Sequence, residues 1–156
     1  MILEIPVLNG VQYNDATASP RMVVFGERYA LNFANSGDTI VFMAALPSGY
    51  LGASLDVKLY WMFPLIPTPP QSVTWSLQIE KLTVGNSLLL NNYSTPRIVT
   101  DASSDPFTIV TSTINLPLAD LASITAGNLF RLKVVSDTVS PTAKPYLLNL
   151  ALFNGS

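Results

Sequence analysis

The chain has 156 residues, of which 12% are charged and 49% are hydrophobic, and its formal net charge is −2. It contains no histidine and no cysteine, which excludes a Ser-His-Asp triad, a Cys-His pair, an imidazole zinc site and a disulfide framework. Because the chain has no basic field, binding to a phosphate backbone is not expected as its main role, and nucleic acid is not an expected partner.

The N-terminal segment is apolar, but it lacks the basic leader and the long apolar run of a signal peptide. Residues 1–20 are interpreted as an N-terminal arm and residues 21–156 as a single domain. No run of about 18 uncharged apolar residues follows, so neither a membrane span nor a membrane partner is expected.

Alternation of apolar and polar residues with a period of two recurs along the chain, in runs separated by Gly, Pro, Asn and Asp. Each run predicts a strand with one face in the core. The predicted strands are Tyr29–Ala34, Thr39–Leu46, Ser54–Met62, Val73–Lys81, Arg97–Thr100, Phe107–Leu116, Leu129–Asp137 and Tyr146–Phe153. The segment Pro117–Ala122, with proline at its first position, predicts a helical turn.

The phase of the alternation predicts where individual side chains point. Trp61 and Trp75 fall on the apolar faces of their runs and are predicted to pack in the core. Glu80 falls on the opposite face of its run and is expected to face water. Beyond it the apolar parity switches to Leu82 and Val84, which predicts a bulge or a bend.

Eight short strands at regular spacing, with almost no helix, predict an all-β fold, an antiparallel eight-stranded β-sandwich. The long crossing loops favour a jelly roll over an immunoglobulin-like sandwich, whose Cys…Trp…Cys signature is missing. The order of the strands within each sheet does not follow from the sequence.

The ten acidic residues fall mostly in turns or on outward strand positions, where solvated surface groups are the expected role. The segment Asp101–Asp105 has the acid spacing of a loose calcium loop, but it lacks the glycine and the terminal glutamate of an EF-hand. We therefore expect no catalytic residue, no cofactor and no metal site, and we expect that the chain is not an enzyme.

Exposed tyrosines leave a sugar-binding alternative open, because stacking on a sugar needs an exposed aromatic ring. Tyr50, Tyr60 and Tyr93 are the better candidates. Arg131 and Lys133 form a short basic stripe on an outer strand face. This stripe is either a solvated face with cross-strand charge pairs or a row of salt bridges between subunits.

Three segments, Ser54–Trp61, Val73–Leu77 and Ala126–Val134, place a strand ending in Trp before a strand starting near Trp, and then a late Ala-Gly-Asn-Leu-Phe-Arg-Leu motif. This pattern resembles small jelly-roll proteins of tailed-bacteriophage virions, of the head decoration or cement type. The resemblance implies a homotrimer on the capsid exterior that binds and stabilises the lattice of the major capsid protein.

Two functional hypotheses follow, since one fold hosts many functions. The first is a structural virion protein, whose permanent contacts would cover the large apolar content of the chain. The alternative is a carbohydrate- or receptor-binding jelly-roll module of a phage tail fibre. Sugar binding predicts exposed aromatic rings in a groove beside Asp or Asn, whereas decoration predicts buried tryptophans and an apolar trimer face.

Candidate interface residues come from the apolar N-terminus, the proline-rich loop at residues 64–70 and the basic stripe. They are Ile2, Leu3, Ile5, Val7, Leu8, Leu65, Ile66, Pro67, Arg131 and Lys133. Deletion of residues 1–8 is expected to weaken binding to particles without unfolding the domain.

Overall fold

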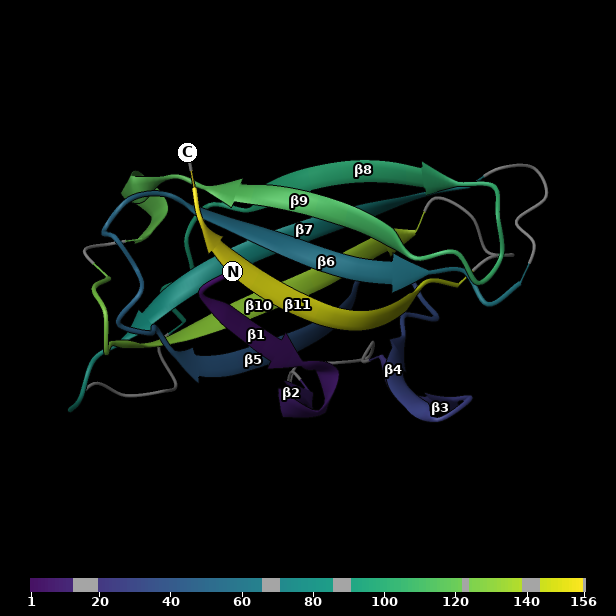
Figure 1. Cartoon of the computed structure of the whole chain (residues 1–156), viewed down its shortest axis with the longest axis horizontal. Coiled ribbons are helices and arrows are strands. Elements are labelled where there is room, and N and C mark those ends of the chain that lie inside the picture. Colours follow the sequence, from purple (N-terminus) through teal and green to yellow (C-terminus); the bar gives the residue numbers. More distant parts are fainter. Residues whose placement is uncertain (13–19, 66–70, 86–90, 122–123, 139–143, 156) are drawn as a thin grey trace.

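Two antiparallel sheets stack face to face and enclose one hydrophobic core (Figure 1). The computed structural model describes residues 1–12, 20–65, 71–85, 91–121, 124–138 and 144–155. The elements are β1 (Leu3–Pro6), η1 (Val7–Asn9), β2 (Gly10–Gln12), β3 (Arg21–Phe25), β4 (Arg28–Asn32), β5 (Asp38–Ala45), β6 (Leu55–Met62), β7 (Gln71–Leu82), β8 (Arg97–Ser103), β9 (Val110–Leu116), η2 (Leu118–Leu121), β10 (Leu129–Thr138) and β11 (Tyr146–Asn154).

The sheet topology is that of a jelly roll. Sheet A has the order β3-β4-β11-β6-β9, with β1 also paired to β11, and sheet B has the order β2-β5-β10-β7-β8. When the strands from β4 to β11 are renumbered 1 to 8, sheet A has the order 1-8-3-6 and sheet B has the order 2-7-4-5. This is the strand order of a jelly roll. These are the eight strands that the alternation predicts, so the predicted all-β jelly-roll sandwich is confirmed.

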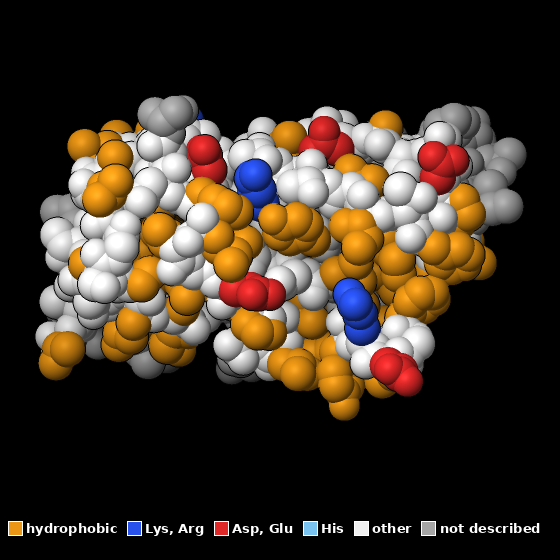
Figure 2. All heavy atoms as spheres, in the orientation of Figure 1, with side chains coloured by type: hydrophobic (Ala, Val, Ile, Leu, Met, Phe, Trp, Pro, Cys, Tyr) orange, Lys and Arg blue, Asp and Glu red, His pale blue; other side chains and the backbone are white. Residues whose placement is uncertain are grey.

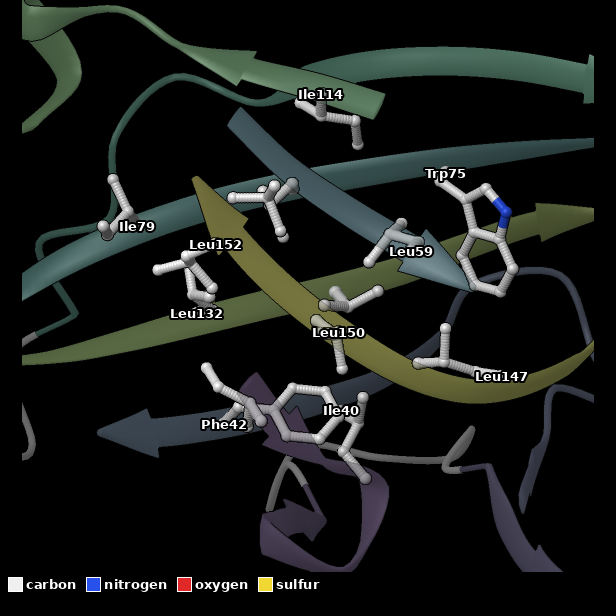
Figure 3. Close-up of a cluster of buried hydrophobic side chains, with 14 of the residues drawn as sticks. Ile40, Phe42, Leu59, Trp75, Ile79, Ile114, Leu132, Leu147, Leu150 and Leu152 are labelled. Carbon is white, nitrogen blue, oxygen red and sulfur yellow. The ribbon is translucent and has the colours of Figure 1, made fainter. Parts of the chain in front are cut away.

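The core fills the space between the sheets with the inward residues of each strand. Figure 3 shows side chains from β5, β6, β7, β9, β10 and β11 meeting there. Trp61 and Trp75 are fully buried, with ring centroids 6.2 Å apart, which confirms their predicted core positions. The indole N–H of Trp61 donates a hydrogen bond of 2.8 Å to Ser112 Oγ, so its polar atom is satisfied inside the core.

The N-terminal segment completes sheet A instead of forming a free arm. β1 pairs antiparallel with β11, from Leu3 opposite Leu152 to Pro6 opposite Asn149. This pairing is possible because β4 covers only Tyr146 and Leu147 of the same β11 edge. The boundary at residue 20 stays a prediction, since residues 13–19 lie outside the described chain.

The irregularities of the sheets differ in part from the prediction. The pairing of β7 with β10 runs without a register shift to Leu82, so the bulge predicted there does not occur in that ladder. A register shift lies instead in β11, between Leu147 and Asn149, where it pairs with β6. The predicted helical turn is present as the 3-10 helix η2.

Candidate functional site

A groove of about 600 Å³ lies on the outer face of sheet A. It forms where β4 and β1 separate along the shared edge of β11, next to the register shift at Leu148. A bulge bends its strand and re-aims side chains, and bulges are frequent beside functional sites. Figure 2 shows this face, where hydrophobic side chains surround isolated charged ones.

Strand pairing arranges outward side chains of sheet A in two rows that cross the sheet, and the groove lies over the part of these rows nearest to β1. One row runs from Pro6 through Asn149 and Tyr60 to Thr111. The parallel row runs from Glu4 through Ala151 and Lys58 to Thr113. Directly opposed residues of antiparallel strands have Cβ atoms about 4.5–5.5 Å apart. Polar and aromatic side chains therefore stand next to one another across four strands.

The polar part of the groove is held by hydrogen bonds. Asn149 Nδ2 donates to Glu4 Oε1 at 2.5 Å, and the N–H of Leu150 donates to Asn149 Oδ1 at 2.9 Å. A carboxylate accepts up to about four hydrogen bonds. Glu4 is thus oriented by Asn149 and retains acceptor capacity for donors that enter the groove.

The aromatic part of the groove comes from two strands. Tyr29 on β4 is 50% exposed, and Tyr60 on β6 is half-buried in the floor. Arg28, adjacent to Tyr29, and Ile109, just before β9, complete this side of the groove. The groove combines ring faces with charged and amide groups, as small-molecule sites commonly do.

A cluster of three aromatic rings fixes the β3–β4 hairpin against the sheet near this groove. Phe25 stacks on Phe107 with centroids 5.6 Å apart and meets Tyr146 edge-on at 6.1 Å. Phe107 has a φ of +59°, which is rare for a bulky residue, and its N–H donates to the carbonyl of Phe63 at 2.8 Å. The ring contacts and this hydrogen bond hold the unusual backbone, two residues before Ile109.

The structure separates the five N-terminal interface candidates into three groups by their exposure. Ile5 and Val7 are 1% and 3% exposed and belong to the core of this chain, which corrects their assignment to an interface. They are buried because β1 and η1 cover the open part of the β11 edge. Ile2 and Leu3 are half-buried against the core. Leu8 is 56% exposed and lines the groove.

The remaining candidates lie on other parts of the molecule. Leu65 is 65% exposed, and Ile66 and Pro67 lie outside the described residues. Arg131 and Lys133 lie on the outer face of sheet B, so the structure does not bring them together with the N-terminal residues.

Arg131 is paired inside its own chain. Its Nε donates to Glu80 Oε2 at 2.9 Å, and the N–H of Asn92 donates to Glu80 Oε1 at 2.9 Å. Glu80 is only 6% exposed, so its predicted water-facing position is wrong. The Tyr93 ring lies 5.3 Å from the Arg131 guanidinium and 5.5 Å from Lys133 Nζ. This internal pairing is the cross-strand charge pair of the first alternative, and a row of salt bridges between subunits stays a prediction.

The three tyrosines proposed for sugar stacking have different environments. Tyr50 is 6% exposed and donates to the carbonyl of Ala53 at 2.5 Å, so its predicted exposure is wrong. Its burial raises the pKa of the phenol. Tyr60 lies in the sheet A groove, and Tyr93 is half-buried over sheet B.

Glu4, Tyr29 and Asn149 line the groove but were not predicted from the sequence as site residues. Glu4 had a usable signal, because it alternates with Leu3 and Ile5 as in a strand with one polar face. No local pattern marks the other two, since strand pairing far along the chain brings them to the groove.

A second ion pair joins η2 to β8. Arg97 Nε donates to Asp120 Oδ2 at 2.6 Å and Nη2 donates to Oδ1 at 3.1 Å. The hydrogen bond to Asp120 raises the pKa of the Arg97 guanidinium.

Across the described ranges, no group of three or more acidic side chains is arranged to hold a metal ion. In the same part of the chain, none of the helices has the length and apolar character needed to cross a membrane.

No known family model and no curated protein match this sequence. Solved structures with a similar fold include Xylanase10C (mutant E385A) from Cellvibrio japonicus in complex with xylopentaose, with a TM-score of 0.60 at 11% identity. The match covers 99% of this chain and spans 29% of the length of that xylanase chain. The xylan-binding module CBM15 has a TM-score of 0.57 at 11% identity, covering 97% of this chain and 95% of its own.

A third similar structure is the CBM22-1 xylan-binding domain from Paenibacillus barcinonensis Xyn10C, with a TM-score of 0.51 at 8% identity, covering 99% of this chain and 96% of its own. Such low identities establish the fold alone. The chain therefore has the jelly-roll β-sandwich seen in carbohydrate-binding modules. This likeness supports the jelly-roll part of the phage resemblance and gives no support to capsid decoration.

Proposed function

We propose that this chain is a non-catalytic carbohydrate-binding module, and that its groove on sheet A holds an oligosaccharide. The observation that carries the proposal is the row in which Tyr60 stands beside Asn149, with Glu4 hydrogen-bonded to that amide. A ring face and an oriented polar pair thus share one open groove of suitable volume for a small ligand.

The chemistry of this row matches the two kinds of surface on a sugar. The C–H face of a pyranose is apolar and stacks on an aromatic ring, and the hydroxyl groups at its edge are both donors and acceptors. Tyr60 and Tyr29 provide ring faces. Glu4 provides acceptors and Asn149 provides both a donor and an acceptor, so hydroxyl groups find partners beside the rings.

The similar structures guide the choice of ligand. CBM15 and the CBM22-1 domain are named as xylan-binding, and the xylanase was solved with xylopentaose. Xylopentaose is therefore the first ligand to test, followed by an array of other glycans if it does not bind.

Isothermal titration calorimetry with the wild type and matched tyrosine variants tests the proposal. We expect Tyr60→Ala to weaken binding at least about tenfold, because a central aromatic anchor is removed. Tyr60→Phe keeps the ring and should retain most of the affinity. Tyr93→Ala removes a ring on the other sheet and should leave the affinity unchanged.

Two outcomes contradict the proposal. If Tyr93→Ala abolishes binding and Tyr60→Ala does not, the ligand site lies on sheet B. If neither xylopentaose nor any glycan of the array binds the wild type, a carbohydrate-binding role is wrong.

A structural protein of a virion is the second candidate function. Large exposed apolar side chains favour it, among them Leu51 at 79%, Val84 at 96% and Ile98 at 66%, which a permanently assembled protein would cover. The homotrimer, the major capsid protein as partner and the location on the capsid exterior remain predictions. Co-sedimentation with assembled capsids tests them, and a protein that stays in the supernatant contradicts them.

A further inference from the structure

β3 is the terminal strand of sheet A, and no described strand pairs with its outer edge. Its side chains are largely exposed, with Met22 at 42% and Val24 at 67%. Natural proteins usually protect such edges with lysine, proline or a covering segment. Within Arg21–Phe25 there is neither lysine nor proline. Figure 2 shows hydrophobic side chains around this hairpin at the lower right, together with one basic and one acidic side chain.

The hairpin geometry fixes which backbone groups face the open edge. Gly26, at φ +60°, and Glu27 form a two-residue turn that closes at the pair Phe25–Arg28. In a two-residue hairpin the closing pair exchanges hydrogen bonds, and bonded and non-bonded pairs alternate from there. The N–H and C=O groups of Met22 and Val24 therefore point away from β4.

We propose that β3 pairs antiparallel with β3 of a second copy of this chain, about a twofold axis at Val23. In this register Met22 lies opposite Val24 of the other copy. The backbone groups that face the open edge then meet each other, and apolar side chains meet apolar side chains. The contact uses the same patch on both copies, so it closes as a dimer.

Charge complementarity supports this pairing. The register places Arg21 opposite Phe25 of the second copy and beside the turn that holds its Glu27. A long side chain reaches such diagonal neighbours across a strand pair. Neither Arg21 nor Glu27 belongs to an ion pair within the described residues. The twofold axis thus brings two Arg–Glu pairs together, and no like charges stand opposite each other.

The dimer has a consequence for the groove, which rests on the proposed function. Residues that face each other across an antiparallel pair point to the same side of the sheet. The outer faces of both copies of sheet A therefore look in one direction. Two grooves on one side would bind a polysaccharide bivalently, with higher avidity than either groove alone.

Sedimentation equilibrium of the purified chain over a range of concentrations tests the dimer. We expect a mass that rises to twice 16.9 kDa. Val24→Pro should remain monomeric, because proline removes an N–H that faces the open edge and leaves the pairing with β4 intact. Val84→Pro is the matched control, since Val84 is exposed and precedes Gly85 (φ +90°) in a turn, a position that accepts proline.

A charge exchange tests the register. Arg21→Glu should weaken the dimer, and adding Glu27→Arg in the same chain should restore it. The proposal is overturned if the wild type stays monomeric at the highest soluble concentration or forms a trimer. It is also overturned if the double variant does not recover the dimer that Arg21→Glu weakens. Calorimetry with xylopentaose on Val24→Pro separates the two proposals, because single-groove affinity depends only on the proposed function and should match the wild type.

Discussion

Ile5→Ala tests whether the N-terminal segment is part of the folded core. Ile5 is 1% exposed and lies among core residues from both sheets. Truncating a buried isoleucine to alanine costs about 2–5 kcal/mol, through lost transfer free energy and the cavity left behind. In a domain of this size each kcal/mol lowers Tm by about 2–4 °C. With a loss of about 3 kcal/mol, we expect Tm to fall by about 6–12 °C.

Leu8→Ala is the matched control, because Leu8 belongs to the same segment but is 56% exposed. Its effect should stay within about 0.5 kcal/mol, or about 1–2 °C. Thermal unfolding followed by circular dichroism measures both variants. Deletion of residues 1–8 should then destabilise the domain, contrary to the expectation from sequence. Equal and small effects of Ile5→Ala and Leu8→Ala would refute the placement of β1 in the core.

Three further predictions follow from buried polar groups. Arg131→Met leaves the buried carboxylate of Glu80 without its cationic partner, so the free energy of unfolding measured in urea should fall by about 3–5 kcal/mol. A fall of less than about 1 kcal/mol would show that water replaces the guanidinium. Ser112→Ala leaves the Trp61 indole N–H unpaired and should cost about 1–3 kcal/mol by the same assay, and an unchanged midpoint would contradict this hydrogen bond. The pKa of Tyr50 is raised in the folded state, so its contribution is present below pH 10 and is lost as pH rises above it. Tyr50→Phe should therefore make the fall of stability above pH 10 shallower, and an unchanged slope would contradict the raised pKa.

The eight jelly-roll strands could be predicted because each of them presents one face to the core. β6 and β7 show this most clearly, with buried and half-buried residues alternating over most of their length. Because the alternation reflects which side chains are buried, it also predicted correctly that Trp61 and Trp75 lie in the core. The order of the strands within each sheet could not be predicted, because it depends on long-range pairing that no local pattern contains.

Two of the strands before β4, β1 and β3, were not predicted, each for its own physical reason. β3 has apolar residues at successive positions from Met22 to Phe25, so both of its faces are apolar and no alternation appears. β1 becomes a strand because β4 leaves most of one β11 edge open. That opening is a property of the assembled sheet, and the first eight residues do not encode it.

The candidate groove could not be predicted from the sequence for a similar reason. Glu4 and Asn149 are 145 positions apart in the chain and meet only through the pairing of β1 with β11. The burial of Glu80 likewise depends on Arg131, which lies 51 positions further along on β10. Alternation assigns Glu80 and Arg131 to the outer face of their strands correctly, but it does not show what covers that face.

Backbone amide shifts measured by nuclear magnetic resonance during titration with xylopentaose show directly whether the sheet A groove is the ligand site. We expect the largest shifts to cluster at Glu4, Tyr60 and Asn149, around the junction of β1, β11 and β6. Shifts that cluster around Tyr93 and Lys133 on sheet B, or a titration that moves no amide, would contradict this expectation.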